Sequence, residues 1–274
     1  VSKIGKGVDK FDVGDEVIIN PLLFCGTCSS CLNQQENQCY SIGILGETTN
    51  GTNCEFISLS QRNLIKKPSN ISFESAASFS LAGQTSYQML INRAKLKKDD
   101  IVFIWGASSG VGSFGLQIAK AYGCKVIATA GSKKKCEYAS ELGADLSLNH
   151  YKDDITSLVK DYTKGKGVNV VFEHPGLETW KTSMKILSRY GRLVTCGSTT
   201  GPKVSIDLRH IFFKQQSILG STMGTLSAFN GIINFIEHGK VVPVVDKIFS
   251  MRNIAEAHKY VENSNQFGKV VLVP

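Results

Sequence analysis

The chain has 274 residues, of which 42% are hydrophobic and 20% are charged, a composition typical of a soluble globular protein with a sizeable core. It contains no run of about 18 apolar residues, so we expect no transmembrane helix and no membrane partner. The net charge of +8 comes largely from dispersed lysines, apart from the run Lys133-Lys134-Lys135, and we expect a solvated basic surface rather than a nucleic-acid-binding one.

The start of the chain carries no recognisable signal peptide and no initiator Met. Residues 1–5 already read like the middle of a strand, so we expect this chain to be a fragment of a longer protein. Eight cysteines without a signal peptide indicate a reducing compartment and metal binding rather than disulfides. The sequence therefore predicts a cytoplasmic location.

The first 72 residues are typical of a β-rich region. Residues 13–19 combine a Gly-Asp turn with an apolar run that predicts a strand, and residues 54–59 predict another. Ser72 is a suitable N-cap for a helix that begins at Phe73.

Four cysteines lie between these two strands, with the spacing C-x2-C-x2-C-x7-C: Cys25, Cys28, Cys31 and Cys39. Four thiolates in one short loop can complete the tetrahedral shell of a structural zinc ion. The competing interpretation is an iron–sulfur cluster, because C-x2-C-x2-C also opens the bacterial ferredoxin motif. In that motif the fourth Cys follows after three residues and precedes Pro, whereas here seven residues intervene and Tyr40 follows. The spacing therefore favours one zinc ion per chain, without an open position for a substrate.

From about residue 83 the pattern changes to short apolar strands alternating with helices. The predicted strands are 101–105, 125–129, 145–148, 169–173, 192–196 and 217–220; the predicted helices are 111–122, 133–142, 153–163, 177–187 and 226–238. This alternation predicts an α/β fold with a doubly wound parallel sheet, as in Rossmann domains. The chain then ends in strand 244–249, helix 253–262 and strand 269–273.

A glycine-rich turn joins the first of these strands to the first helix: Gly106, Ala107, Ser108, Ser109, Gly110, Val111 and Gly112. Glycines let the backbone approach a pyrophosphate closely, and the helix N-terminus supplies N–H donors and a positive dipole end. In this strand–turn–helix context the motif predicts dinucleotide binding.

The end of the second strand lacks the acidic residue that usually binds the ribose 2′-hydroxyl of NAD. About twenty residues past the glycines, the chain has Ala130, Gly131 and Ser132, followed by the three lysines. A 2′-phosphate would meet a hydroxyl donor and cations here, with no repulsion. We therefore expect NADP(H) as the cofactor, with Ser132 and Lys133 at the phosphate; the alternative is that the lysines only begin an exposed helix.

Together these features resemble the medium-chain dehydrogenase/reductase family, the group of zinc-containing alcohol dehydrogenases and quinone oxidoreductases. The resemblance rests on Val13–Val17, the four cysteines, the Gly106–Gly112 loop, Leu142–Asp145 and the closing Phe267–Leu272. It implies a partial, β-rich GroES-like catalytic domain over residues 1–82, with the zinc lobe at 25–39. It further implies a dinucleotide-binding domain over 83–238, and a return to the catalytic domain over 239–274. It also implies that Lys269 contacts the cofactor.

Two departures from the family pattern concern catalysis. The family's first segment, which carries ligands of its catalytic zinc, is expected to be absent, and the remaining ligand position of that site corresponds to Leu81. His174, at the end of a predicted strand, is the one histidine placed where ligands bind in such sheets. Gln84, Thr85 and Ser198 are the candidate cleft residues; the catalytic residues themselves stay undefined.

These expectations combine into an oxidoreductase that transfers hydride between NADP(H) and a small carbonyl, enone or quinone. We expect a small-molecule substrate, a homo-oligomer (a dimer or a tetramer) and no nucleic-acid partner. Two alternatives stay open. One is a non-catalytic NADPH-binding or nucleic-acid-binding relative. The other is a zinc alcohol dehydrogenase whose catalytic ligands precede residue 1. In every case the 274-residue chain alone could be inactive.

Overall fold

The central sheet of the computed structural model, which describes residues 1–274, has six parallel strands in the order β10-β9-β8-β5-β6-β7. The strands are β5 (Ile101–Ile104), β6 (Lys125–Ala130), β7 (Leu146–Asn149), β8 (Val168–Glu173), β9 (Leu187–Thr195) and β10 (Ser217–Gly220). The order reverses between β5 and β8, which is the doubly wound arrangement that the alternating pattern predicts.

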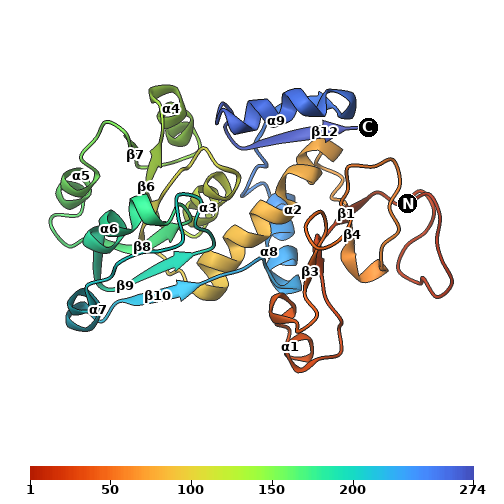
Figure 1. Cartoon of the computed structure of the whole chain (residues 1–274), viewed down its shortest axis with the longest axis horizontal. Helices are drawn as coiled ribbons and strands as arrows, with labels where there is room; N and C mark the ends of the chain where they lie inside the picture. Colours follow the sequence, from red (N-terminus) through yellow and green to blue (C-terminus); the bar gives the residue numbers. More distant parts are fainter.

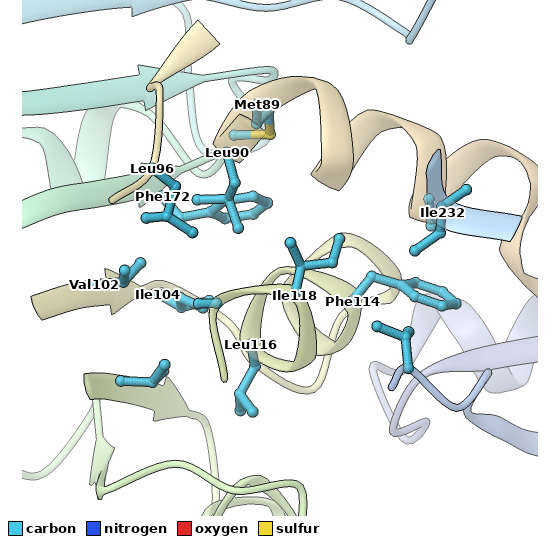
Figure 2. Close-up of a cluster of buried hydrophobic side chains, with 14 of the residues drawn as sticks. Met89, Leu90, Leu96, Val102, Ile104, Phe114, Leu116, Ile118, Phe172 and Ile232 are labelled. Atoms are coloured by element: carbon cyan, nitrogen blue, oxygen red, sulfur yellow. The ribbon is translucent and has the colours of Figure 1, made fainter. Parts of the chain in front are cut away.

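Helices cover both faces of this sheet: α3 (Gly110–Ala121), α4 (Lys133–Glu141), α5 (Ile155–Tyr162), α6 (Leu177–Ile186), α7 (Leu208–Lys214) and α8 (Leu226–Glu237). Because side chains alternate along a strand, Val102 and Ile104 enter one core cluster with α3 and α8, whereas Phe103 and Trp105 enter a second with α5 and α6. Leu116 and Ile118 project from different sides of α3 (Figure 2), so this helix is apolar on more than one side, and it is buried from Gly112 through Ala119.

Helix α2 (Phe73–Tyr87), which continues as the π-helical turn η3 (Gln88–Arg93), connects the sheet to the rest of the molecule. It packs on α3 and α8, and it also contacts β1 and β12. The Ser86 hydroxyl donates to the carbonyls of Ala82 and Val111, which ties α2 to the first turn of α3. Ser72 caps α2 as predicted, since its side chain accepts from the Ser75 N–H.

The β-rich part contains three two-stranded sheets (right side of Figure 1): β1–β4, β2–β3 and β11–β12. Its elements from the first 66 residues are β1 (Val17–Ile19), β2 (Leu22–Leu23), α1 (Ser29–Leu32), η1 (Glu36–Gln38), β3 (Gly43–Ile44), η2 (Gln61–Asn63) and β4 (Leu64–Lys66). The C-terminal elements are β11 (Val245–Ser250), η4 (Met251–Asn253), α9 (Ile254–Glu262) and β12 (Lys269–Val273).

Some expected elements are wrong. Residues 54–59 form no strand, because no other strand of the protein pairs with them, and Phe56 is 77% exposed. Residues 1–5 are likewise not in a strand, and the predicted strand over 13–19 is limited to β1. Helix α7 is not predicted from the sequence, and strand β9 begins five residues before its predicted start at residue 192. No helix is both long and apolar enough to cross a bilayer.

Candidate nucleotide site and metal centre

The four cysteines of the 25–39 loop point their sulfur atoms at one another. Their Sγ atoms are 3.5 Å apart for Cys28 and Cys31, 3.6 Å for Cys25 and Cys39, and 3.9 Å for Cys25 and Cys31. Four sulfurs at about 2.3 Å from one zinc ion would be about 3.8 Å apart, the edge of a tetrahedron. The loop is therefore already folded to the size of a tetrahedral zinc–thiolate shell.

Backbone N–H groups surround these sulfurs. The N–H groups of Thr27 and Cys28 donate to Cys25 Sγ at 3.4 and 3.3 Å, and the Cys25 N–H donates to Cys39 Sγ at 3.3 Å. The hydrogen bonds that Cys25 Sγ accepts, those from Thr27 most of all, lower the pKa of Cys25 to about 5. Desolvation raises the pKa of Cys31 to about 12, so a full set of four thiolates requires a cation at the centre.

The metal loop docks on the helical part through its own short helix η1. Glu36 is buried, and its carboxylate accepts the Leu226 N–H at the start of α8 at 3.2 Å. The Asn37 side chain donates to the Thr222 carbonyl at 2.8 Å. An acidic side chain at a helix N-terminus meets unpaired N–H groups and the positive end of the dipole. The cysteine cluster thus holds residues that join the two parts of the molecule.

The glycine-rich loop lies at the carboxyl end of β5, as its sequence predicts. Gly106 has φ +56°, and its N–H donates to the Thr129 hydroxyl of the neighbouring strand. A Cβ on Gly112 would come within 2.2 Å of the Gly106 carbonyl oxygen. Only glycine fits there, because the first turn of α3 packs directly on the loop. Ser109 caps α3 by accepting the Gly112 N–H.

The start of α3 holds donors without partners and one cation. The N–H groups of Gly110 and Val111 make no hydrogen bond within the chain. Lys269, the first residue of β12, lies over this turn, since its Cδ is 2.7 Å from the position of a Cβ on Gly110. It forms no ion pair, and burial lowers its pKa. Unpaired N–H groups beside an unpaired, partly buried cation are the surroundings that a phosphate oxygen requires.

His174, at the end of β8, lies beside the same loop. Its Nε2 donates to the Trp105 carbonyl at 3.0 Å, and burial lowers its pKa, so the ring is neutral at pH 7. Beneath it the Ser183 hydroxyl accepts from Trp105 Nε1 and donates to the buried carboxylate of Glu173. Sequence reasoning missed this Trp105–Ser183–Glu173 network; the position of Glu173 at a strand end was the available signal.

The end of β6 carries no carboxylate from Ala130 through Cys136. The Ser132 hydroxyl caps α4 by accepting the Lys135 N–H. The Lys133 side chain is 92% exposed, and its ammonium group forms an ion pair with Glu137 at 3.9 Å. Lys135 points away from this strand end, because its ammonium group donates a hydrogen bond to the Ser264 carbonyl. The Lys134 ammonium group lies 5.6 Å from the Tyr138 ring centroid. Lys133, whose ion pair with Glu137 is exposed to solvent, is therefore the lysine of the run that is left for a ligand at this strand end.

The structure does not bring the three candidate cleft residues together in one open pocket. Gln84 is fully buried, where its amide donates to Asn20, and Thr85 is also buried. Ser198 lies on the exposed loop after β9. Their catalytic role stays a prediction.

Leu81 faces a separate cavity of about 450 Å³ between α2, β1 and β12. Leu81 is 44% exposed, and most of the other lining residues are apolar, among them Phe73, Met251 and Val270. In residues 1–274 the four cysteines form the one group of three or more potential ligands close enough to share a metal ion. The surroundings of Leu81 therefore supply an apolar wall and no metal ligands.

Two family models match the chain. The zinc-binding dehydrogenase model covers residues 110–238, and the alcohol dehydrogenase GroES-like domain model covers residues 1–69. The first range runs from α3 to the end of α8 and includes every strand of the six-stranded sheet except β5. The second covers the N-terminal part of the β-rich region with the cysteine loop.

Known proteins are similar over the whole chain. A crystal structure of an NAD-dependent alcohol dehydrogenase shares 39% identity and a TM-score of 0.95 over 100% of this chain and 80% of that one. A 2-octenoyl-CoA carboxylase reductase, solved with NADP and 2-octenoyl-CoA, shares 32% identity and a TM-score of 0.91 over 98% of this chain and 65% of its own. Crotonyl-CoA reductase of Streptomyces avermitilis is 29% identical over 98% of this chain and 65% of its own length.

The chain thus spans about two thirds of the length of these reductases. Both family models, the cysteine cluster and the glycine loop agree with the resemblance seen in the sequence. The chain belongs to the medium-chain dehydrogenase/reductase family, among the zinc-type, alcohol dehydrogenase-like oxidoreductases.

Proposed function

We propose that this protein binds NADP(H) on the Gly106–Gly112 loop and transfers hydride between it and a small electrophilic substrate. The observation that carries the proposal is Lys269, which lies over the unpaired N–H groups of Gly110 and Val111 without any carboxylate partner. A dinucleotide pyrophosphate would supply the missing negative charge. Ala107, Ser108 and Ser109 complete the backbone that would follow it.

The preference for NADP(H) over NAD(H) rests on the end of β6. An adenosine ribose there would meet the Ser132 hydroxyl and the exposed ammonium group of Lys133. No residue from Ala130 through Cys136 carries a carboxylate, and Glu137 is already paired with Lys133 at 3.9 Å. One similar structure contains NADP and another is described as NAD-dependent, so relatives do not decide between the cofactors. The charges at this strand end support NADP(H).

The proposed substrate is an α,β-unsaturated carbonyl compound or a quinone. Residues 1–274 bring together no second set of metal ligands, and the cavity beside Leu81 is apolar. Hydrogen bonds alone can activate an enone or a quinone for hydride addition at carbon, whereas a simple alcohol needs stronger polarisation of its oxygen. Two of the similar proteins are named crotonyl-CoA reductase and 2-octenoyl-CoA carboxylase reductase, which supports an α,β-unsaturated thioester as one form of this substrate.

One zinc ion is proposed to sit between the four cysteines and to have a structural role. When bound, it would supply the positive charge that four converging thiolates require, and it would fix η1 against α8. The eight cysteines are all unpaired, which fits a reducing compartment such as the cytoplasm.

The proposed domains are residues 1–82, 83–238 and 239–274, with the first and last forming one GroES-like unit. The boundary at 82 falls within α2, so one continuous helix would belong to both domains. We further propose a homo-oligomer that pairs through the edge strand β10. Leu208, Phe212 and Phe213 of the adjacent α7 are all more than half exposed, which a second copy of the chain could cover.

The function is tested by measuring NADPH oxidation with a quinone, a simple enone and crotonyl-CoA, and NADP⁺ reduction with a simple alcohol. We expect turnover with at least one of the first three and none with the alcohol. Turnover with the alcohol alone would contradict the substrate class. NADPH binding is measured in parallel, so that an inactive but cofactor-binding chain is distinguished from one that binds no cofactor.

A further inference from the structure

A basic pocket of about 580 Å³ opens at the amino ends of the sheet strands, on the opposite edge from the glycine loop. It lies where β5, β8 and β9 begin and where α5, α6 and α7 end. In Figure 1 the arrows of β9 and β10 point away from α7 and toward α2, so the two sites are at opposite edges. Nothing in the proposed hydride transfer uses this pocket.

Four cationic side chains line the pocket: Lys166, Lys185, Arg189 and Lys214. None of the lining residues is acidic, and none of the four cations forms an ion pair. Burial and the charge of Arg189 together lower the pKa of Lys214, so these cations repel one another without a counter-charge. Like charges gathered in a concave site raise the local concentration of anions.

Hydrogen bonds orient two of these cations, Arg189 and Lys214. The Arg189 guanidinium donates to the Phe213 carbonyl at 3.1 Å, and the Lys214 ammonium group donates to the Leu187 carbonyl at 3.3 Å. Lys166 lies within a turn whose backbone is fixed by the Thr163 hydroxyl, which accepts the Gly167 N–H at 3.0 Å. Carbonyl partners orient a cation but do not neutralise it, so charge is left for a ligand.

Helix C-termini attract cations, and this accounts for part of the pattern. Lys185 and Lys214 lie in the last turns of α6 and α7, where they stabilise the negative ends of the helices. Lys166 lies in a turn and Arg189 on a strand, so the dipole effect explains neither. Their convergence on one pocket requires another reason.

We propose that this pocket binds a small polyanion through its phosphate groups, such as a pyrophosphate or a phosphorylated metabolite. The volume suits one small ligand. The backbone N–H groups of Gly165, Lys166 and Gly167 are already bonded within the turn, so the side chains provide the binding. No aromatic residue lines the pocket, so neither a nucleobase nor single-stranded RNA would find a stacking surface.

The test uses isothermal titration calorimetry of the full chain with inorganic pyrophosphate and inorganic phosphate at low ionic strength. The test variant is K166Q/K185Q, because neither side chain makes a hydrogen bond and the fold should be unaffected. K160Q is the matched control: Lys160 lies in the last turn of α5 but not in the pocket. K269Q removes the cation at the glycine loop and reports any pyrophosphate bound there.

We expect the wild-type chain to bind pyrophosphate more tightly than phosphate. K166Q/K185Q should weaken pyrophosphate binding by about tenfold or more, since two cation–phosphate contacts are lost. K160Q should bind it like the wild type. K269Q should remove any pyrophosphate bound at the glycine loop and leave the binding that K166Q/K185Q weakens. Unchanged binding by K166Q/K185Q, equal weakening by K160Q, or complete loss in K269Q would overturn the proposal. R189Q repeats the test if the double variant does not fold. If an RNA oligonucleotide bound to the same lysines more tightly than pyrophosphate does, the proposal of a small ligand would be overturned in favour of a nucleic acid.

Discussion

The side chain of Lys269 lies over Gly110, with its Cδ 2.7 Å from the position that a Cβ on Gly110 would take. Gly110 begins the helix after the glycine loop, and Lys269 begins the last strand of the chain. The Gly268 N–H also donates to the Ser108 carbonyl at 2.9 Å. The proposed pyrophosphate site is therefore assembled from the middle and the end of the sequence.

Replacing Lys269 with Gln should weaken NADPH binding by about tenfold, because the one cation over the first turn of α3 is removed. Burial lowers the pKa of Lys269, and a bound phosphate would favour its charged form. Binding should then take up a proton, and the affinity of the wild-type chain should fall as pH rises through that lowered pKa toward 10.5. Calorimetry in buffers of different ionisation enthalpy measures the proton uptake; a pH-independent affinity in this range would contradict the role of Lys269.

Gly112→Ala should abolish measurable NADPH binding. Its Cβ would stand 2.2 Å from the Gly106 carbonyl oxygen and 2.9 Å from the Ala107 Cα, both backbone atoms that can move only if the loop opens. Gly5→Ala is the control, since a Cβ there would meet nothing within 4 Å. Fluorescence titration compares the two variants, and wild-type affinity in Gly112→Ala would show that the cofactor does not use this loop.

Lys133→Gln should weaken NADPH binding about three- to tenfold, as expected for loss of one exposed cation–phosphate contact, and leave NADH binding unchanged. Lys134→Gln is the matched control, because the Lys134 ammonium group instead lies 5.6 Å from the Tyr138 ring centroid. Both variants are titrated with NADPH and with NADH, and the four affinities are compared with those of the wild-type chain. Equal losses for NADPH and NADH would place Lys133 away from the 2′-phosphate.

Cys39→Ser should remove zinc and lower the free energy of unfolding by an amount on the order of 5 kcal/mol, because a structural zinc ion contributes directly to folding. Hydrogen exchange at the Leu226 N–H should also quicken, since Glu36 would no longer be held against α8. Cys54→Ser serves as control for loss of a cysteine outside the cluster. Metal analysis should give one zinc per wild-type chain; two zinc ions, or iron with a brown colour, would refute the assignment.

Ser183→Ala should lower the free energy of unfolding by about 1–3 kcal/mol, because Trp105 Nε1 and the Glu173 carboxylate each lose their buried partner. Burial raises the pKa of Glu173, so the native state keeps this proton to higher pH than the unfolded chain does. The group's stabilising contribution is full below pH 4.5 and is lost as pH rises through the raised pKa. Chemical denaturation of Ser183→Ala should therefore show a larger loss at pH 8 than at pH 5. The control, Thr182→Ala, should show neither effect.

The six sheet strands and most of their helices could be predicted, because buried parallel strands leave short apolar runs between amphipathic helices. The cysteine cluster could also be predicted, because its four ligands lie within a segment of fifteen residues. The strand expected over 54–59 is wrong for a physical reason: an apolar run becomes a strand only where another strand pairs with it. The amino-acid composition of a short segment does not show whether another strand lies beside it.

Long-range placements were harder to predict. The family resemblance implied that Lys269 contacts the cofactor, but not that it lies over Gly110. The contact between Glu36 and Leu226 had no signal in the sequence. The basic pocket joins four cations from separate elements, which are dispersed lysines and one arginine when read along the chain. Such sites depend on which ends of which elements meet, and the fold alone determines this.

The most direct test of the central claim is a titration of the chain with NADPH and with NADH, followed by intrinsic tryptophan fluorescence. Trp105 directly precedes Gly106, so a cofactor on the loop should change its emission. We predict saturable binding of both cofactors, with NADPH bound about tenfold more tightly because of the Ser132 hydroxyl and the Lys133 ammonium group. Equal or tighter binding of NADH would contradict the cofactor assignment, and no binding of either would contradict the proposed function.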